Sequence, residues 1–474
     1  MGSRFSRRTM MQGAGGVALA QSFGAALAAP ASRRWPIDEG PDTPKICLSP
    51  GDGGRAMVAP AATAAAPGGQ QAPGAAGRGA AAGRGGGGGG YGGFLAPGAQ
   101  PAPAAPAAGA GRGGGGGADP SVSYQRIKQL GVHYLLGVGI GGSPWTVENV
   151  RRAVETAKQY GMVAYNSMIN IPASIIYGRE NRSKDMEVVL ASIEAAGKGG
   201  LPVVEYNFYA HRAIEGYYET VGRARAGYTA FDYELELLVD ENNNVVQPIY
   251  RDEKGQITPE TLAAFPNARR VKFKDLPPRP DIGAWTLDQM WANITWFLKI
   301  AVPAAEKANV KLALHPNDPP APISRGSQQI MGTLAGWKRL IEIVNSPANG
   351  ITFDCGVTRE LGEDPVAAAE YFASRKRINH AHYRNVLVDK PYEKYQEVFV
   401  DNGMVDMFGV MRALVRNKYT GTIYPEHPRA LDYDRDRVGP GGRIGGYPGG
   451  GGYTGIAYSV AYTRAMIQAA VASL

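Results

Sequence analysis

The chain has 474 residues, a formal net charge of +8 at pH 7 and two cysteines, Cys47 and Cys355. This length fits one large domain or two of ordinary size, and two cysteines exclude a disulfide framework. The basic residues form no arginine block beside aromatic side chains, so composition and charge argue against a nucleic-acid-binding protein.

Residues 1–28 have the features of an export signal. Phe5-Ser-Arg-Arg-Thr-Met-Met11 resembles the twin-arginine motif, a weakly apolar stretch runs from Gly13 to Leu27, and Ala26-Leu-Ala28 matches a cleavage site. The apolar stretch is too short and too rich in glycine for a stable membrane span. We therefore predict export by the twin-arginine machinery to the periplasm or another extracytoplasmic compartment. A disordered basic tail is the alternative.

A low-complexity tract follows the first predicted strand, Lys45–Ser49. Residues 51–118 consist largely of Gly, Ala and Pro with scattered Arg. Such a composition cannot bury enough apolar surface to offset the entropy lost on ordering. We predict a disordered insertion in the first strand-to-helix loop.

Beyond this tract, strand-like and helix-like patterns alternate. The predicted strands are His133–Ile140, Met162–Met168, Pro202–Phe208, Lys311–His315, Ile351–Cys355, Ile378–His382 and Gly421–Glu426. The predicted helices are Ser121–Leu130, Thr146–Tyr160, Lys184–Ala196, Thr286–Asn309, Gln328–Asn345, Pro365–Ser374, Val405–Asn417 and Gly455–Ala472. A polar excursion from His211 to Asp281 interrupts the alternation, with a hairpin expected at Tyr233–Tyr250 and its turn at Glu241–Asn244.

With the first strand, this pattern has eight strands and eight helices. It predicts an α/β fold, a (β/α)8 TIM barrel formed by residues 29–474, rather than an open doubly wound sheet.

Four of the predicted strands end on a side chain that can bind a metal. These side chains are His315, Cys355, His382 and Glu426. The C-terminal strand ends of a β/α barrel face one shared mouth, so the four should converge there. Nitrogen, sulfur and oxygen ligands together are typical of a transition-metal site, and a thiolate favours Zn, Fe, Co or Mn over Mg or Ca.

The neighbours of these residues refine the prediction. Prolines after His315 impose a rigid, extended loop. His380 and His382 share one face of their strand; we predict His382 as the ligand and place His380 in the layer below or in an orienting role. Cys355 has a competing interpretation, because a buried free cysteine is usually inert packing.

Further polar residues surround the predicted mouth. Arg384 and Asn385 follow His382 and suit a carboxylate or hydroxyl, or else form a solvated loop. Glu426 and His427 would place a metal ligand beside a side chain that transfers protons. Tyr447 lies in a Gly-rich loop that can close over a ligand and bring in a phenol.

Taken together, these segments resemble the mannonate dehydratase family of xylose-isomerase-like TIM barrels. The resemblance runs from about Pro44 to the C-terminus, apart from the low-complexity tract, and is strongest from Thr286 onward. It is carried by Leu314-His-Pro-Asn-Asp-Pro-Pro320, Asn349-Gly350 leading to Cys355, Arg377-Ile378, His382-Tyr-Arg-Asn385, Gly403-Met-Val-Asp-Met407 and Tyr424-Pro-Glu-His427. Looser matches are Glu205-Tyr-Asn-Phe208 and Ser143-Pro-Trp145.

The resemblance implies a lyase that removes water from a sugar acid, D-mannonate, to give 2-keto-3-deoxy-D-gluconate. The implied metal is Mn²⁺, with Fe²⁺, Co²⁺ or Zn²⁺ as alternatives. By position, the implied metal ligands are His315, Cys355, His382 and Glu426, the acid/base pair is His427 and Tyr447, and the substrate-binding residues are Trp145, Asn207, Arg384 and Asn385.

The chain also departs from the family pattern. The family usually has Asp at the position of Glu426 and Gly-His at Pro428-Arg429, and Cys355 aligns only after a shift of one residue. A sugar isomerase or epimerase of the xylose-isomerase-like type and a non-catalytic sugar-acid binder are the alternative functions. The sequence leaves the oligomeric state open.

Overall fold

The computed structural model describes residues 40–53, 121–252, 255–436 and 447–474. The predicted export signal and most of the low-complexity tract lie outside these residues. The described residues from Asp42 onward belong to one compact unit. None of the helices in the described part of the chain combines the length and hydropathy that a membrane crossing requires.

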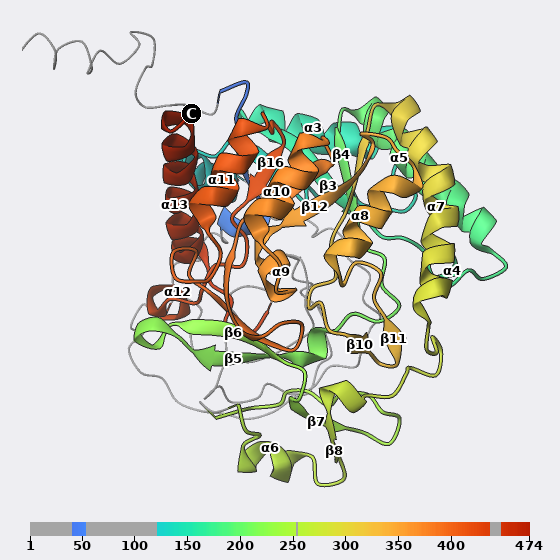
Figure 1. The fold of residues 1–474 in the computed structure, drawn as a ribbon, viewed down its shortest axis with the longest axis vertical. Coiled ribbons are helices and arrows are strands. Elements are labelled where there is room, and N and C mark those ends of the chain that lie inside the picture. The colour runs from blue at the N-terminus through green and yellow to red at the C-terminus, as the bar shows by residue number, and fades with distance from the viewer. Residues whose placement is uncertain (1–39, 54–120, 253–254, 437–446) are drawn as a thin grey trace, which may run out of the picture. The chain divides into compact units, whose positions relative to one another are not determined.

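Eight parallel strands close into a barrel, and each strand pairs with its neighbours in chain order (Figure 1). The closing pair joins the first strand to the last, with Lys45 opposite Thr422. The barrel strands are β1 (Lys45–Leu48), β2 (Tyr134–Leu136), β3 (Val163–Ile169), β4 (Val203–Tyr206), β9 (Lys311–Leu314), β12 (Asn349–Asp354), β13 (Ile378–His382) and β16 (Thr422–Tyr424). The predicted (β/α)8 barrel is therefore confirmed.

Eight longer helices alternate with these strands. They are α2 (Ser121–Gln129), α3 (Val147–Gln159), α5 (Arg182–Gly199), α7 (Leu287–Ala308), α8 (Leu334–Ile343), α10 (Pro365–Ser374), α11 (Met407–Arg416) and α13 (Tyr453–Ala472). Their starts follow from local sequence: a capping box of Thr286 and Gln289 opens α7, and Asp364 caps α10 with Pro365 in its first turn. Helix α8 begins later than predicted, because Gln328 belongs to a small sheet of β10 (Ile323–Ser324) and β11 (Ser327–Gln328).

Segments outside the barrel build a second, antiparallel sheet that the sequence patterns did not reveal. Its order is β14-β15-β6-β5. The strands are β5 (Tyr217–Val221), β6 (Gly227–Asp232), β14 (Asn385–Lys390) and β15 (Lys394–Val398). The first two come from the polar excursion and the last two from the loop after β13, so two distant loops form one sheet at the C-terminal side of the barrel strands.

The hairpin predicted at Tyr233–Tyr250 is only partly present. Its Asn-rich turn exists, because the Asn244 carbonyl accepts from the Asp240 N–H, but the arms share only the bridge between Val239 and Val245. Strand β7 (Glu236–Val239) pairs instead with β8 (Arg269–Lys272). Pro248 has no N–H to donate, which disfavours continued pairing of the second arm.

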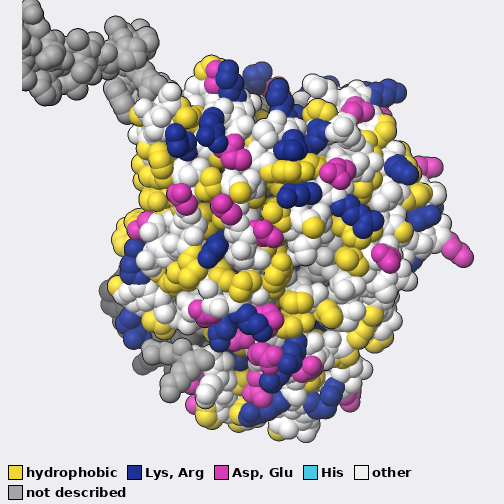
Figure 2. Space-filling model, in the orientation of Figure 1, with side chains coloured by type: hydrophobic (Ala, Val, Ile, Leu, Met, Phe, Trp, Pro, Cys, Tyr) yellow, Lys and Arg dark blue, Asp and Glu magenta, His cyan; other side chains and the backbone are white. Residues whose placement is uncertain are grey.

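Opposite charges face each other across the β7–β8 ribbon. Arg270 Nη1 lies 3.2 Å from Glu236 Oε2, and Lys272 Nζ lies 2.8 Å from Glu234 Oε2. Figure 2 shows basic and acidic side chains gathered in the lower part of the molecule, the region in which Figure 1 places β7 and β8. Such exposed cross-strand pairs add little to the stability of the ribbon, because water and salt screen their charges.

The shorter helical segments complete the described elements. They are η1 (Pro50–Gly53), α4 (Ala173–Ile176), η2 (Ile214–Gly216), η3 (Arg223–Arg225), α6 (Pro259–Ala264), η4 (Phe273–Asp275), α9 (Cys355–Glu360) and α12 (Asp432–Asp436). Segment η1 contacts the start of α2: Ser123 Oγ donates to the Pro50 carbonyl, and Arg126 Nη1 donates to the Gly53 carbonyl at 3.1 Å. The chain thus leaves the barrel before the low-complexity tract and re-enters it after the tract at adjacent points.

Helix α11 gives a test of the core. Leu414 is fully buried against the barrel, whereas Phe408 on the same helix is 38% exposed. We expect Leu414→Ala to lower the free energy of unfolding by about 2–5 kcal/mol, because it removes buried methyl groups and leaves a cavity. Phe408→Ala should cost less than about 1 kcal/mol. Urea unfolding followed by circular dichroism measures both, and equal losses would contradict this packing.

Candidate metal centre

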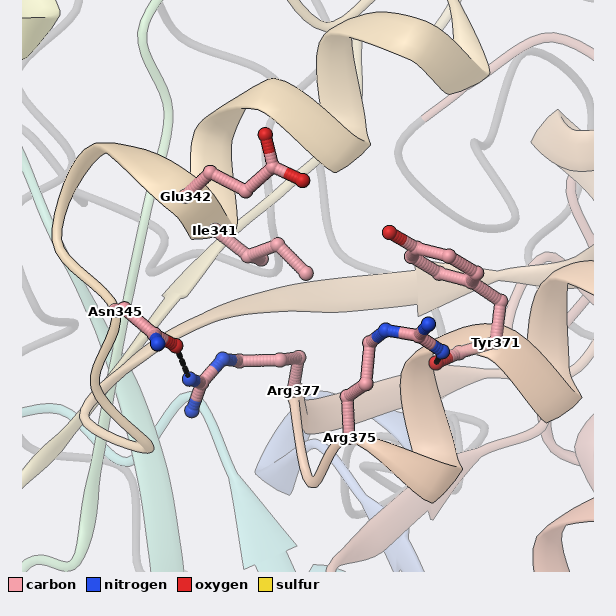
Figure 3. Close-up of a pocket in the computed structure, with 6 residues that line it drawn as sticks. All are labelled: Ile341, Glu342, Asn345, Tyr371, Arg375 and Arg377. Atoms are coloured by element: carbon pink, nitrogen blue, oxygen red, sulfur yellow. Dashed lines mark hydrogen bonds between the residues drawn. The ribbon is translucent and has the colours of Figure 1, made fainter.

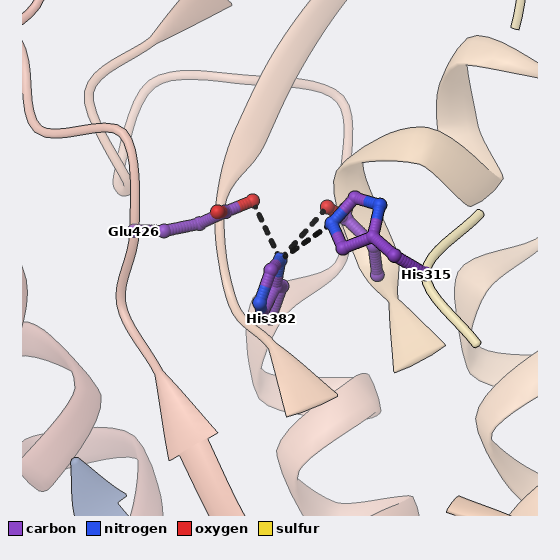
Figure 4. Close-up of side chains that lie close together, drawn as sticks. His315, His382 and Glu426 are labelled. Atoms are coloured by element: carbon purple, nitrogen blue, oxygen red, sulfur yellow. Dashed lines mark hydrogen bonds and ion pairs between the residues drawn. The ribbon is translucent and has the colours of Figure 1, made fainter. Parts of the chain in front are cut away.

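Four side chains from the ends of four barrel strands meet at the C-terminal mouth. His315 follows β9, Asp354 ends β12, His382 ends β13 and Glu426 follows β16. All four are buried, and one ligand atom of each lies within 4.8 Å of the others. Figure 4 labels three of them, with His382 between Glu426 and His315. The barrel thus brings together three of the four predicted ligands, and a carboxylate takes the fourth place.

His382 is the centre of this ligand cluster. Its Nδ1 lies 2.9 Å from Glu426 Oε1, 3.6 Å from Asp354 Oδ2 and 3.3 Å from His315 Nε2. Its other ring nitrogen, Nε2, lies 3.9 Å from Glu205 Oε1, and Thr352 Oγ1 donates to that same oxygen at 2.9 Å. Glu205 therefore occupies the position of an orienting carboxylate that turns Nδ1 toward the cluster.

The second imidazole is oriented by the backbone. His315 Nδ1 donates to the Pro316 carbonyl at 2.8 Å, so Nε2 points to the other members of the cluster. Burial, together with the nearby His382, lowers the pKa of His315 to about 3. The ring is therefore neutral near pH 7, which is the form that binds a metal.

The charges in the cluster suit a cation. Burial lowers the pKa of His382, but the carboxylates of Glu426 and Asp354 outweigh this effect and raise the pKa to about 10. Burial raises the pKa of Asp354, but Arg384 and His382 hold it well below its ordinary value. Two carboxylates and two imidazoles form a donor set that divalent transition metals accept. A bound divalent cation would replace the proton of His382 between the carboxylates.

The structure places Cys355 outside this cluster. Asp354 and Cys355 are consecutive, so their side chains point to opposite faces of the strand end. Thr352 and Asp354 point into the barrel, whereas Cys355 begins α9, is fully buried among apolar side chains and donates Sγ–H to the Arg384 carbonyl at 3.3 Å. Burial and the nearby Asp354 raise the pKa of its thiol, which disfavours the thiolate. Asp354 replaces Cys355 in the predicted set of four.

His380 lies one layer deeper, as the sequence analysis expected. In the register of β12 and β13, Thr352 faces His380 and Asp354 faces His382. His380 is fully buried, and its Nδ1 lies 2.9 Å from Thr422 Oγ1. The alternation of side chains along these strands therefore separates the mouth layer from the layer below it.

Arg384 lies beside the cluster within a group of buried carboxylates. It is 2% exposed, and its Nε lies 3.0 Å from Asp354 Oδ2 and 3.2 Å from Glu426 Oε1. Its Nη atoms lie near Glu360 at 2.6 Å, Asp318 at 3.2 Å and Glu397 at 3.6 Å. The guanidinium predicted to bind a substrate carboxylate instead contacts five carboxylates of the protein.

Two other predicted substrate-binding residues contact their own surroundings. Asn385 donates to the Val400 carbonyl and accepts from the backbone N–H groups of Val386 and Val405. Trp145 is 8% exposed in the main apolar core. These contacts give both residues a structural role.

Asn207 lies just beyond β4 and is only partly buried. Its Nδ2 lies 3.2 Å from Met168 Sδ, and its Oδ1 accepts from the Tyr209 hydroxyl at 2.5 Å. Of the four predicted substrate-binding residues, it is the one whose side chain is not buried.

The predicted acid/base pair is together. The rings of His427 and Tyr447 have centroids 4.4 Å apart, and His427 Nε2 lies 3.5 Å from Glu426 Oε2. Burial lowers the pKa of His427, but Glu397 and Glu426 raise it above its ordinary value. Burial raises the pKa of Tyr447 well above its ordinary value, so its phenol stays protonated.

Glycines allow the Tyr447 loop to lie this close. A Cβ at Gly451 would lie 2.1 Å from the Arg429 carbonyl oxygen, and Gly449 has a φ of +68° with the Tyr228 backbone 2.4 Å from its Cβ position. No side chain fits at either position. The unusual glycine content of this loop follows from its close packing against the residues after β16.

The hollow shown in Figure 3 lies at the other end of the barrel. It has a volume of about 470 Å³, and Arg377 and Asn345 beside it precede the first residues of β13 and β12. Arg377 Nη2 donates to Asn345 Oδ1 there. The N-terminal face of such barrels serves stability rather than chemistry, so this hollow is separate from the ligand cluster.

Comparisons with known proteins identify the family of this chain. The model of the D-mannonate dehydratase family matches residues 115–472. A mannonate dehydratase from Enterococcus faecalis is 29% identical over 326 residues, which is 66% of this chain and 87% of that protein. One from Shouchella clausii is 28% identical over 345 residues, 68% of this chain and 89% of that protein.

A solved structure supports the same relationship. The crystal structure of mannonate dehydratase from Streptococcus suis is similar with a TM-score of 0.56 and 25% sequence identity, covering 74% of this chain and 91% of that one. The family model spans nearly the whole barrel after the low-complexity tract, with the four strand ends of the ligand cluster inside it. The chain belongs to the D-mannonate dehydratase family.

Proposed function

We propose that this protein is a divalent-metal-dependent hydro-lyase that converts D-mannonate to 2-keto-3-deoxy-D-gluconate. The observation that carries the proposal is the buried cluster of His315, Asp354, His382 and Glu426 with His427 beside it, in a chain of this family. Membership in this family favours dehydration over the two alternative functions, a sugar isomerase or epimerase and a non-catalytic sugar-acid binder.

The four residues of the ligand cluster would hold the metal. His315 would bind through Nε2 and His382 through Nδ1, because Pro316 and Glu205 face their other nitrogens. Two carboxylates and no thiolate shift the preference from zinc toward metals that favour oxygen, so we propose Mn²⁺. When bound, the metal supplies the positive charge that stabilises negative charge on the substrate carboxylate as C2 loses its proton.

His427 and Tyr447 would carry out the two proton transfers. The C2–H bond and the C3–O bond break, a double bond forms between C2 and C3, and the C3 hydroxyl leaves as water after accepting a proton. The resulting enol then becomes the 2-keto acid. We assign removal of the C2 proton and protonation of the C3 hydroxyl to this pair jointly, because the two rings lie in contact and His427 Nε2 lies 3.5 Å from Glu426 Oε2.

The N-terminus supports a separate proposal, export through the twin-arginine pathway. It rests on Phe5–Met11 and the cleavage-site match at Ala26–Ala28. We expect Arg7→Lys together with Arg8→Lys to abolish export, because the receptor reads the arginine pair. Cell fractionation with immunodetection measures this, and unchanged export would remove the proposal.

Turnover tests the reaction. We expect the purified chain with added Mn²⁺ to form a 2-keto-3-deoxy acid from D-mannonate, detected by colorimetric assay and mass spectrometry. His427→Ala should lower kcat by about 10²–10⁴-fold, since it removes a group that transfers a proton. Its bound metal, measured by elemental analysis, should stay the same. Metal-loaded protein that forms no product from D-mannonate would refute the substrate assignment.

Metal binding tests the ligand set. We expect Asp354→Asn to weaken Mn²⁺ binding on the order of 100-fold or more, because it removes a charged ligand while its amide oxygen can still cap α9. Cys355→Ser, one residue away, should leave affinity within about threefold. Calorimetric titration distinguishes the two, and the reverse result would restore Cys355 as the ligand.

Metal removal tests whether the charges of the ligand cluster favour a bound cation. Saturating Mn²⁺ at about 100 times its Kd should stabilise the folded chain by about 2.7 kcal/mol, because the ion binds only the assembled cluster. Differential scanning calorimetry with Mn²⁺ and with chelator should show a higher Tm with the metal. Cys355→Ser should keep this shift and Asp354→Asn should lose most of it; a Tm independent of metal in the wild type would contradict the site.

A further inference from the structure

Glu397 is a buried carboxylate that reaches the mouth from outside the barrel. It lies on β15, where the ladder sets it opposite Val386 on β14 and Thr229 on β6. Its exposed fraction is 1%. Its position therefore depends on the antiparallel sheet and not on any barrel strand.

Glu397 contacts the predicted acid/base histidine directly. Both of its carboxylate oxygens lie 3.0 Å from His427 Nδ1, which donates to them. The opposite ring nitrogen, Nε2, then faces Glu426 of the ligand cluster at 3.5 Å. The contact with Glu397 thus determines which nitrogen of His427 faces the place where substrate would bind.

Arg429 fixes Glu397 in this position. It is 1% exposed; its Nη2 donates to Glu397 Oε2 at 2.8 Å, and its Nη1 donates to the Glu397 carbonyl at 3.1 Å. Its Nε also donates to the His427 carbonyl at 2.9 Å. Glu397, Arg429 and His427 therefore form a closed ring of hydrogen bonds.

The hydrogen bonds among Glu397, Arg429 and His427 hold the backbone of His427 in an unfavourable conformation. His427 has a φ of +50°, which lies in the left-handed region that residues other than glycine seldom adopt. Such a conformation is unfavourable and persists only where the surroundings determine it. Here the Arg429 guanidinium, which donates to the His427 carbonyl, and the tilted ring of Tyr447, which contacts the imidazole, supply those surroundings.

We propose that Glu397 positions His427 for proton transfer through Nε2, and that Arg429 holds Glu397 in place; this rests on the proposed dehydratase function. Glu397 and Arg429 are positioning residues, because they act through His427. A carboxylate on Nδ1 fixes the orientation of an imidazole while the other nitrogen exchanges a proton with substrate.

Asp318, Glu397 and His427 also lie close enough to one another to hold a metal ion. Two guanidinium groups already neutralise these carboxylates, however. Arg429 contacts Glu397, and Arg384 contacts both Asp318 and Glu397. The positioning role explains the contacts without a second cation.

The test compares two isosteric substitutions on the same hairpin. Glu397→Gln removes the charge that faces His427, whereas Glu393→Gln changes a partly exposed residue that pairs with Lys390. We expect Glu397→Gln to lower kcat by about 10²–10⁴-fold with KM within about threefold and Mn²⁺ content unchanged. Glu393→Gln should match the wild type.

A double-mutant cycle separates positioning from general damage. Once His427 is replaced by Ala, adding Glu397→Gln should cause no further loss of rate, because Glu397 acts only through the imidazole. Losses that multiply, or a fall in metal content in the single Glu397→Gln variant, would overturn the proposal. If Glu397→Gln fails to fold, Glu397→Asp tests the same contact with the charge kept and the carboxylate withdrawn by one methylene. It should lower kcat with KM unchanged.

A spectroscopic measurement tests the contact between Glu397 and His427 without any substrate. In the Mg²⁺-loaded full chain labelled with ¹⁵N-histidine, the wild type should show a downfield Nδ1–H proton of His427, assigned by its loss in His427→Gln. We expect Glu397→Gln to shift or remove it and Glu393→Gln to keep it; a signal unchanged in Glu397→Gln would overturn the proposal. If the signal depends on Glu397 but wild type forms no product from D-mannonate, the proposed function fails while the contact stands.

Discussion

The mouth of this barrel depends on one buried guanidinium. Arg384 lies among five carboxylates that would repel one another strongly at these distances in a low-dielectric interior. Its Nε contacts two members of the ligand cluster, and its Nη atoms contact three acids that lie outside it. Against the effect of burial, it lowers the pKa of Asp354, while His382 and His427 lower that of Glu426. It also lies between the ligand cluster and the second group of acids around His427.

This arrangement divides the mouth into two parts with different charge balance. On one side of Arg384, the cluster around His382 has more negative than fixed positive charge and suits a divalent cation. On the other side, Glu397 is neutralised by Arg429 and faces His427. One part suits binding of a metal and the other suits movement of protons, and Glu426 touches both.

The barrel could be predicted from the sequence because every strand and helix carries its own local signal. Apolar runs mark the strands, and caps such as Thr286 and Asp364 mark the helix starts. The sheet of β5, β6, β14 and β15 could not, because its pairing joins loops far apart in the chain and its strands carry mixed polarity. Glu397 was missed for the same reason, since nothing local connects it with the mouth.

The alternation of side chains along a strand distinguishes Asp354 from Cys355 as a metal ligand. The alternation that places His380 and His382 on one face also places Thr352 and Asp354 on one face, and it turns Cys355 away. The one-residue shift needed to align Cys355 with the family pattern was therefore the available signal for Asp354. Arg384 was placed correctly at the mouth, but five partners distant in sequence determine what it touches.

The point where the chain departs for its low-complexity tract has a practical consequence. Because Pro50 and Gly53 are bonded to Ser123 and Arg126, the barrel is closed at this loop by contacts that lie outside residues 54–120. A shorter linker from Gly53 to Ser121 would therefore join two points that these hydrogen bonds already hold together. The described barrel thus offers one place where the chain can be shortened without removing a barrel strand or helix.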